Sequence, residues 1–166
     1  MLRQQLALRR SGVSTIATAL ALALSLASGV PAKNGNESGI VTIGSAYPID
    51  ETIDRLKKDV EGKGIVLFQV IDQHRLARAA NIELLPSTLL VFGNPALGAH
   101  FITAEPTAGL DWPVRVLVHQ DAEGRVWASF TDFHWIARRH RIENRKAEFD
   151  MATKVVRSIL SSVAAK

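Results

Sequence analysis

Five polar residues supply the side-chain chemistry from which a binding site in this chain could be built: Asn94, Asp111, Arg115, His119 and Asp132. An amide, two carboxylates, a guanidinium and an imidazole offer hydrogen-bond donors and acceptors, the groups that orient a small molecule in a pocket. We therefore predict that these residues contribute to ligand binding. The sequence assigns no residue a catalytic role.

The motifs of several common enzyme chemistries are missing from the sequence. None of its serines lies in a Gly-x-Ser-x-Gly turn, the signature of a hydrolase nucleophile. No glycine pattern typical of a phosphate-binding loop or a dinucleotide-binding turn occurs either. Two interpretations of Asp72, Asp111 and Asp132 stay open. Two of these carboxylates could act as a catalytic pair like that of a glycosidase, or each could be a helix cap or turn residue.

The spacing of the histidines does not indicate a metal site. His134 and His140 are six residues apart, or about 240° around a helix, so they point to different helix faces. A metal could still join histidines that are distant in sequence, such as His119 and His134. We expect neither a metal nor a cofactor.

Two further stretches each have a structural and a functional interpretation. Gly93-Asn94-Pro95 suits a helix start, with Asn94 as the cap, but a helix start can also hold an anion. The basic segment from Arg138 to Lys146 suits a solvated helix end, but it could also contact anionic lipid or polysaccharide.

The segment VRVLVHQ-DAEG-RVWASFT predicts a β-hairpin, because two alternating runs flank four turn residues that end in glycine. Arg115, Leu117 and His119 then share one face of the sheet. With a four-residue turn, His119 lies opposite Val126 and Arg115 opposite Phe130. This mixed face suits a ligand groove or the solvent side of the sheet.

The hydrophobic pattern of the remaining chain predicts an α+β fold. Apolar runs indicate further strands at 40–43, 65–71 and 89–92. Amphipathic or capped segments indicate helices that follow Asp50, Asp72, Asn94 and Asp132, and a long one that begins at Lys146. A hairpin combined with helical crossovers favours a mostly antiparallel sheet with helices packed on one face.

The N-terminus has the three parts of a secretory signal peptide. Arg3, Arg9 and Arg10 precede an uncharged apolar run, and Val30 and Ala32 suit a cut before Lys33. The alternative is an uncleaved membrane anchor, but the apolar run of about 15 residues is shorter than the ~20 that span a bilayer. We therefore expect a periplasmic or secreted protein with no stable membrane span after cleavage. The expected parts are a signal peptide 1–32, a flexible leader 33–39, a core domain 40–142 and a C-terminal amphipathic helix 143–166 packed on that domain.

Charge and cysteine content narrow the expected partners and the source of stability. The chain has a net charge of +4, and removing the three basic residues of the signal leaves +1, so a nucleic-acid partner is not expected. The chain has no cysteine, so packing without disulfides must stabilise it.

Four segments closely resemble a bacterial family of unknown function, DUF302: LLPSTLLVFGNPALG, GLDWPVRVLV, DAEGRVW and ASFTDFHWIARRHRI. The similar region runs from about Ile40 to Ile142. Many members have histidine directly after the aspartate at position 72, where this chain has Gln73. The resemblance implies an α+β fold like that of TATA-box-binding-protein half-domains, assembled as a dimer. It implies no established activity.

These observations favour an exported, non-enzymatic, homodimeric module that binds a small molecule or a protein partner. The alternative is a small periplasmic hydrolase or isomerase that uses a His/Asp pair, with His119 or His134 as the histidine.

Overall fold

The computed structural model describes residues 37–165. The predicted signal peptide and most of the leader lie outside the described residues. In chain order the elements are β1 (Ile40–Gly44), α1 (Ile49–Gly62), β2 (Val66–Asp72), α2 (Gln73–Ala79), β3 (Ser87–Gly93), α3 (Pro95–Ala104), the 3-10 helix η1 (Pro106–Leu110), β4 (Val114–Gln120), β5 (Val126–Thr131), α4 (Phe133–His140) and α5 (Lys146–Ser161).

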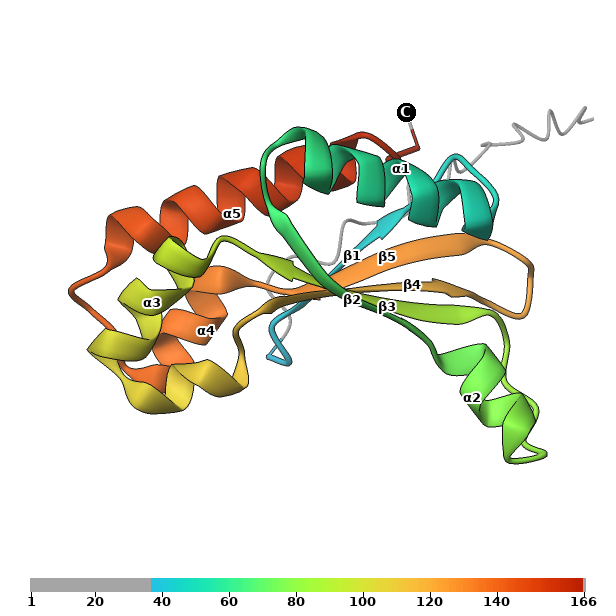
Figure 1. Cartoon of the computed structure of the whole chain (residues 1–166), viewed down its shortest axis with the longest axis horizontal. Helices are drawn as coiled ribbons and strands as arrows, with labels where there is room; N and C mark the ends of the chain where they lie inside the picture. The colour runs from blue at the N-terminus through green and yellow to red at the C-terminus, as the bar shows by residue number, and fades with distance from the viewer. Residues whose placement is uncertain (1–36, 166) are drawn as a thin grey trace, which may run out of the picture. The chain divides into compact units, whose positions relative to one another are not determined.

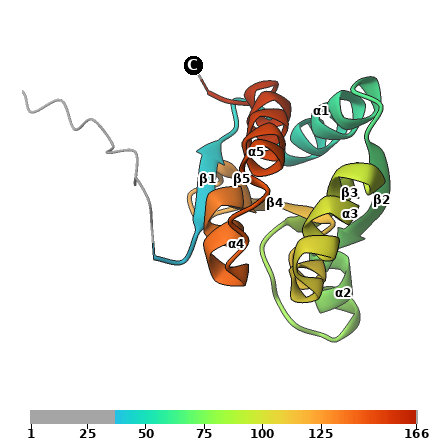
Figure 2. The same ribbon diagram turned by 90° about the vertical axis from the view of Figure 1, so that its left-hand side faces the viewer.

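The five strands form one antiparallel sheet in the order β1-β5-β4-β3-β2. Helices α1 and α5 lie over the same face of this sheet (Figure 1). Helix α3, η1 and α4 gather at one end of the strands, whereas α2 projects at the other end (Figures 1 and 2). The predicted α+β class with an antiparallel sheet is confirmed.

The core lies between the sheet and the two long helices. Alternate residues of β3, β4 and β5 point toward the helices and are buried, as a strand with one covered face requires. Helix α1 contributes Leu56 and Val60, both fully buried, and α5 contributes Phe149, Val156 and Ile159. Burial of such side chains contributes about 2 kcal/mol each.

Three of the predicted capping residues occupy N-cap positions. The side chains of Asp72, Asn94 and Asp132 accept hydrogen bonds from the backbone N–H groups of Arg75, Leu97 and Trp135, respectively. The expected cap at Asp50 is wrong. Helix α1 begins at Ile49 after Pro48, so Asp50 lies in its first turn, where a carboxylate is favoured by the helix dipole.

The hairpin forms as expected, but its turn is one residue shorter. The backbone N–H of Asp121 bonds to the carbonyl of Arg125, and Gly124 has a φ of +79°. A three-residue turn with glycine in a left-handed conformation therefore closes the hairpin. His119 lies opposite Trp127, not Val126, so the predicted register is wrong by one residue.

The opposite face of the sheet has no described helix across it (Figure 1). Arg115, Leu117 and His119 share that face, because Val116 and Val118 between them point into the core. Helix α2 has no buried residue. Large apolar side chains on α2 and the segment after it are exposed: Leu76, Ile82, Leu84 and Leu85.

Both ends of the described chain are fastened to the domain. Trp135 donates its indole N–H to the carbonyl of Glu37, and its ring lies against Gly39, whose φ is +69°. After α5, Ala164 pairs with Ser45 beyond the end of β1. Among residues 37–165, no helix has the length and apolar character needed to cross a membrane.

Candidate functional site

An apolar cavity of about 260 Å³ lies between the sheet end, α3, α4 and α5. Its walls come from segments far apart in sequence, which the antiparallel sheet and the return of α5 bring together. Most of the lining is aromatic or aliphatic: Ile65, Phe92, Leu97, Phe101, Trp112, Val114, Phe133, Met151, Ala152, Val155 and Val156. A concave space with this lining suits a small apolar molecule.

Trp112 forms a wall of the cavity, and two glycines make room for its indole. A Cβ atom on Gly98 would overlap the indole, and one on Gly93 would lie 3.2 Å from it. Phe68 meets the same ring edge-on, with the ring centroids 5.9 Å apart. The indole is therefore packed against backbone on one side, which fixes this wall.

The aromatic rings on the α3 side of the cavity are also packed. Phe101 of α3 stacks on Phe149 of α5 at a centroid distance of 4.3 Å, and Phe133 lies 6.5 Å from Phe101. Phe101, Phe133 and Phe149 are almost fully buried. These contacts tie α3, α4 and α5 to one another around the cavity.

Two polar residues line the cavity. Asn94 caps α3 through its side-chain oxygen, with the bond from the Leu97 N–H measuring 3.2 Å. Its amide nitrogen has no hydrogen bond within residues 37–165 and can donate to a ligand. Lys63 forms an ion pair of 2.7 Å with Asp59. One amide and one ammonium could therefore orient a ligand whose body is apolar.

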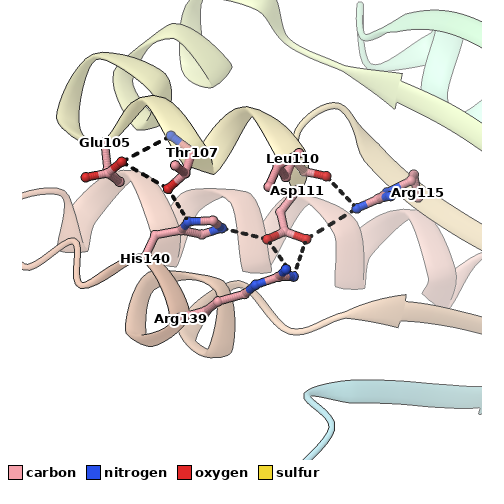
Figure 3. A network of polar contacts seen from close by, with 7 residues as sticks. All are labelled: Glu105, Thr107, Leu110, Asp111, Arg115, Arg139 and His140. Atoms are coloured by element: carbon pink, nitrogen blue, oxygen red, sulfur yellow. Dashed lines mark hydrogen bonds and ion pairs between the residues drawn. The ribbon is translucent and has the colours of Figure 1, made fainter.

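A polar network surrounds Asp111, the residue before Trp112 (Figure 3). The Asp111 side chain is only 4% exposed, and its carboxylate contacts Arg139 at 3.1 Å, Arg115 at 3.3 Å and His140 Nε2 at 2.7 Å. Several cationic partners compensate the cost of burying one carboxylate. The network fastens the end of α4 to the segment between η1 and β4.

The network extends from His140 to the start of η1. His140 Nδ1 lies 3.0 Å from the Thr107 hydroxyl, which donates to Glu105 at 2.9 Å. Hydrogen bonds from the Thr107 backbone N–H and then its hydroxyl lower the pKa of Glu105, and the nearby His140 lowers it further. One chain of contacts thus runs from the Glu105 carboxylate through the Thr107 hydroxyl and the His140 imidazole to the Asp111 carboxylate (Figure 3).

The five predicted ligand-binding residues do not meet at one place. Asp111 and Arg115 contact each other, and Asn94 lines the apolar cavity. His119 lies on the open face of β4, between Ser87 and Trp127 of the neighbouring strands. Asp132 caps α4, with a 2.9 Å bond from the Trp135 N–H. The helix-cap interpretation therefore accounts for the Asn94 and Asp132 side-chain oxygens.

Sequence reasoning missed Arg139 and His140 as neighbours of Asp111, and Thr107 as the neighbour of His140. They come from α4 and η1, and neither element could be docked on the other from spacing alone. His134, considered as a catalytic histidine, lies 3.4 Å from Asp150, and both side chains are 45% exposed. Among the described residues, no group of three or more His, Asp or Glu side chains is placed to hold a metal ion.

A family model described as a domain of unknown function, DUF302, matches residues 41–163. The match continues past Ile142 and includes α5. A solved structure titled an uncharacterized conserved protein DUF302 from Bacillus stearothermophilus has a TM-score of 0.69 and 16% sequence identity. The similarity covers 75% of this chain and 98% of that one, so the two proteins share a fold.

Curated relatives are similar over part of their length. Two proteins named fluoride-specific ion channel FluC 1, from Brucella suis biovar 1 (strain 1330) and Brucella abortus biovar 1 (strain 9-941), are 36% identical to this chain over 106 residues. The matching segment is 64% of this chain. It is 42% of the first relative and 39% of the second, so this chain spans about two fifths of their length.

Proposed function

The chain belongs to the DUF302 family, and we propose that it is an exported, dimeric, non-enzymatic module that binds a small apolar molecule in the cavity beside Trp112. The observation that supports binding is the cavity of about 260 Å³ with its aromatic lining. Asn94 and Lys63 supply hydrogen-bond donors for a polar end of the ligand.

Binding can be tested with N-phenyl-1-naphthylamine, whose fluorescence rises when it leaves water. We expect saturable binding to the wild type and at least a tenfold loss for Val155→Trp, which fills the cavity from α5. Lys154→Trp is the matched control, because Lys154 is exposed on the same helix and does not line the cavity. Equal binding by both variants would place the probe elsewhere and contradict the proposal.

Exposed apolar side chains on α2 and the segment after it support the dimer. Ile82 is 61% exposed and Leu85 is 50% exposed. Helix α2, which precedes them, has no buried residue either. Covering such side chains with a second copy removes apolar surface from water. Light scattering should give a dimer for the wild type and a monomer for Ile82→Asp with Leu85→Asp. A monomeric wild type rejects the dimer.

Export rests on the basic, apolar and small-residue parts of the first 32 residues. Mass spectrometry of the protein recovered from the producing cells should give a chain that begins at Lys33. A chain that retains its first 32 residues at the membrane would support the anchor interpretation instead.

A membrane channel is the candidate protein partner. Segments similar to this chain form part of longer proteins named fluoride-specific ion channels, so a segment of this kind and the rest of such a protein occur there in one polypeptide. Co-expression with the Brucella suis relative from which the similar segment has been deleted should give a complex that survives purification. Separate elution of the two proteins would argue against this partner.

The second candidate function is a small hydrolase or isomerase that uses a His/Asp pair. The Thr107–His140–Asp111 contacts favour it, because a hydroxyl and a carboxylate flank one imidazole. The two arginines on Asp111 and the Glu105 acceptor on Thr107 equally suit a structural network. Ester and isomerase substrate panels should show no turnover. Turnover lost in a folded His140→Gln protein, with His119→Ala as the comparison, would establish the enzyme.

A further inference from the structure

Two half-exposed arginines meet at one oxygen of a buried carboxylate. Arg115 and Arg139 reach Asp111 Oδ1 at 3.3 Å and 3.2 Å, and their side chains are 48% and 46% exposed. Arg115 also donates to the Leu110 carbonyl at 2.8 Å. A guanidinium has five N–H donors in a planar fork, so each arginine keeps donors that face solvent. Asp111 therefore holds the two guanidinium groups close together and leaves some of their N–H donors free to bind another group.

The charge at this place is positive. The Asp111 carboxylate faces two guanidinium groups, those of Arg115 and Arg139, and the other carboxylate of the network, Glu105, is bonded to Thr107. Arg138 lies beside Arg139 in the last turn of α4, and Arg141 directly follows that helix. Both are exposed, and neither forms an ion pair with another residue of the described chain. Within this part of the chain the four arginines outnumber the two carboxylates of the network, Asp111 and Glu105, so the excess positive charge attracts anions.

An exposed apolar residue is bonded to Arg115. Leu110 ends η1, is 67% exposed, and its backbone carbonyl accepts a hydrogen bond from the Arg115 guanidinium (Figure 3). Exposed leucine next to arginine is typical of surfaces that enter the headgroup region of a bilayer, where the apolar group is buried and the cations stay at the phosphates. Free phosphate would use the arginines but not the leucine.

We infer that the arginine–leucine surface, made of Leu110, Arg115 and Arg139 and flanked along the chain by Arg138 and Arg141, docks on anionic phospholipid. The Arg115 and Arg139 forks bind headgroup phosphate oxygens, with which guanidinium geometry forms paired hydrogen bonds. Leu110 inserts between headgroups. The inference is independent of the apolar cavity, which lies on other residues.

Vesicle co-sedimentation of the full chain tests this inference. Vesicles of phosphatidylcholine alone are compared with vesicles that also contain phosphatidylglycerol. The apolar run from Val13 to Ala27 and the arginines before it are common to every variant, so the difference between variants, and not the total binding, measures the arginine–leucine surface. We expect stronger binding to the anionic vesicles, and about thirtyfold weaker binding for Arg115→Gln with Arg139→Gln, the effect of two basic side chains at an anionic surface.

Matched variants separate this surface from net charge and from folding. Arg75→Gln with Arg78→Gln removes the same charge from exposed positions of α2 and should bind like the wild type. Leu110→Ser removes the apolar side chain without adding charge, leaves the Asp111 contacts in place and should also weaken binding to anionic vesicles, which decides the question if the double arginine variant unfolds. Equal losses in the α2 variant, or no preference for anionic vesicles, would overturn the inference.

Inorganic phosphate distinguishes the two sources of a phosphate group. Calorimetric titration with inorganic phosphate should give only weak binding, and Leu110→Ser, which adds no charge, should not change it. Phosphate binding at the strength of the vesicle binding, together with unchanged vesicle binding by Leu110→Ser, would assign the arginines to a free anion and reject the membrane surface.

Discussion

Asp121 is the carboxylate whose surroundings most clearly change its chemistry. It accepts hydrogen bonds from the Trp127 indole at 2.8 Å and from the Arg125 guanidinium at 2.7 Å, and also from two turn backbone N–H groups. Its burial acts to raise the pKa, but the bonds from Trp127 and Arg125 outweigh that effect and lower the pKa of Asp121 from 3.8 to about 2. The residue therefore closes the hairpin as an anion.

This shift predicts a pH dependence of stability. The folded protein holds Asp121 deprotonated at a pH where the unfolded chain binds a proton, so its contribution to stability is present above 3.8 and is lost as the pH falls toward 2. Asp121→Asn should lower the free energy of unfolding at neutral pH, and the difference from the wild type should shrink across that window. Urea unfolding at a series of pH values measures it. A difference that is independent of pH would contradict the assignment.

Gly98 is the residue on which the Trp112 wall most depends. A methyl group there would meet the indole, so Gly98→Ala should lower the free energy of unfolding by about 2 kcal/mol, as overpacking of a tight contact does. Urea denaturation followed by tryptophan fluorescence measures the stability of each variant.

Gly62→Ala is the control for Gly98→Ala, because no atom lies within 4 Å of the methyl group that it adds at the end of α1. It should leave stability unchanged or raise it slightly. Equal stability of the two variants would mean that Trp112 can move away from Gly98 without cost.

At the scale of elements, Asp111 joins α4 to the segment that leads from η1 into β4. Its replacement leaves His140, whose side chain is only 5% exposed, without its anionic partner. Asp111→Asn should therefore lower the free energy of unfolding by about 2 kcal/mol, the range for hydrogen bonds to charged groups. Hydrogen exchange should show the largest increase in α4.

Asp54→Asn provides the comparison for Asp111→Asn. Asp54 pairs with Lys57 at 3.2 Å, but its side chain is 75% exposed, so the loss should stay below about 0.5 kcal/mol. If both substitutions had the same small effect, the Asp111 network would not be a structural link between these elements.

The elements differ in how well the sequence predicts them. Local signals place β1, the cap at Asp72 and the start of α3, because each depends on neighbouring residues alone. The hairpin register depends on the turn, and four turn-forming residues do not reveal that Asp121 already pairs with Arg125. The end of α5 comes at Ser161, before the last residues turn to pair beside β1.

The cavity and the Asp111 network depend on how elements distant in sequence pack together, and the sequence does not predict that packing. The cavity lining looks like ordinary core in sequence, since Phe92, Leu97 and Val155 are apolar residues at strand or helix spacing. Only the relative placement of α3, α5 and the sheet leaves a space between them. The Asp111 network likewise needs α4 to return beside η1, and no local spacing records that return.

At this scale the apolar cavity, the exposed α2 segment and the arginine–leucine surface lie on different parts of one domain. A ligand, a second copy and a membrane could therefore be bound at separate places, and each can be disabled by its own substitutions: Val155→Trp, Ile82→Asp with Leu85→Asp, and Leu110→Ser. We expect each set to leave the other two properties intact, because the substituted residues do not share contacts.

The most direct test of the account is a crystal structure of this protein grown with bromobenzene, located by the anomalous signal of bromine. The account predicts a bromine peak inside the cavity, between Leu97 of α3 and Val155 of α5 and against the Trp112 ring. A cavity without bromine, with peaks only on α2 or on the open face of the sheet, would contradict the proposal that this domain binds small apolar molecules beside Trp112.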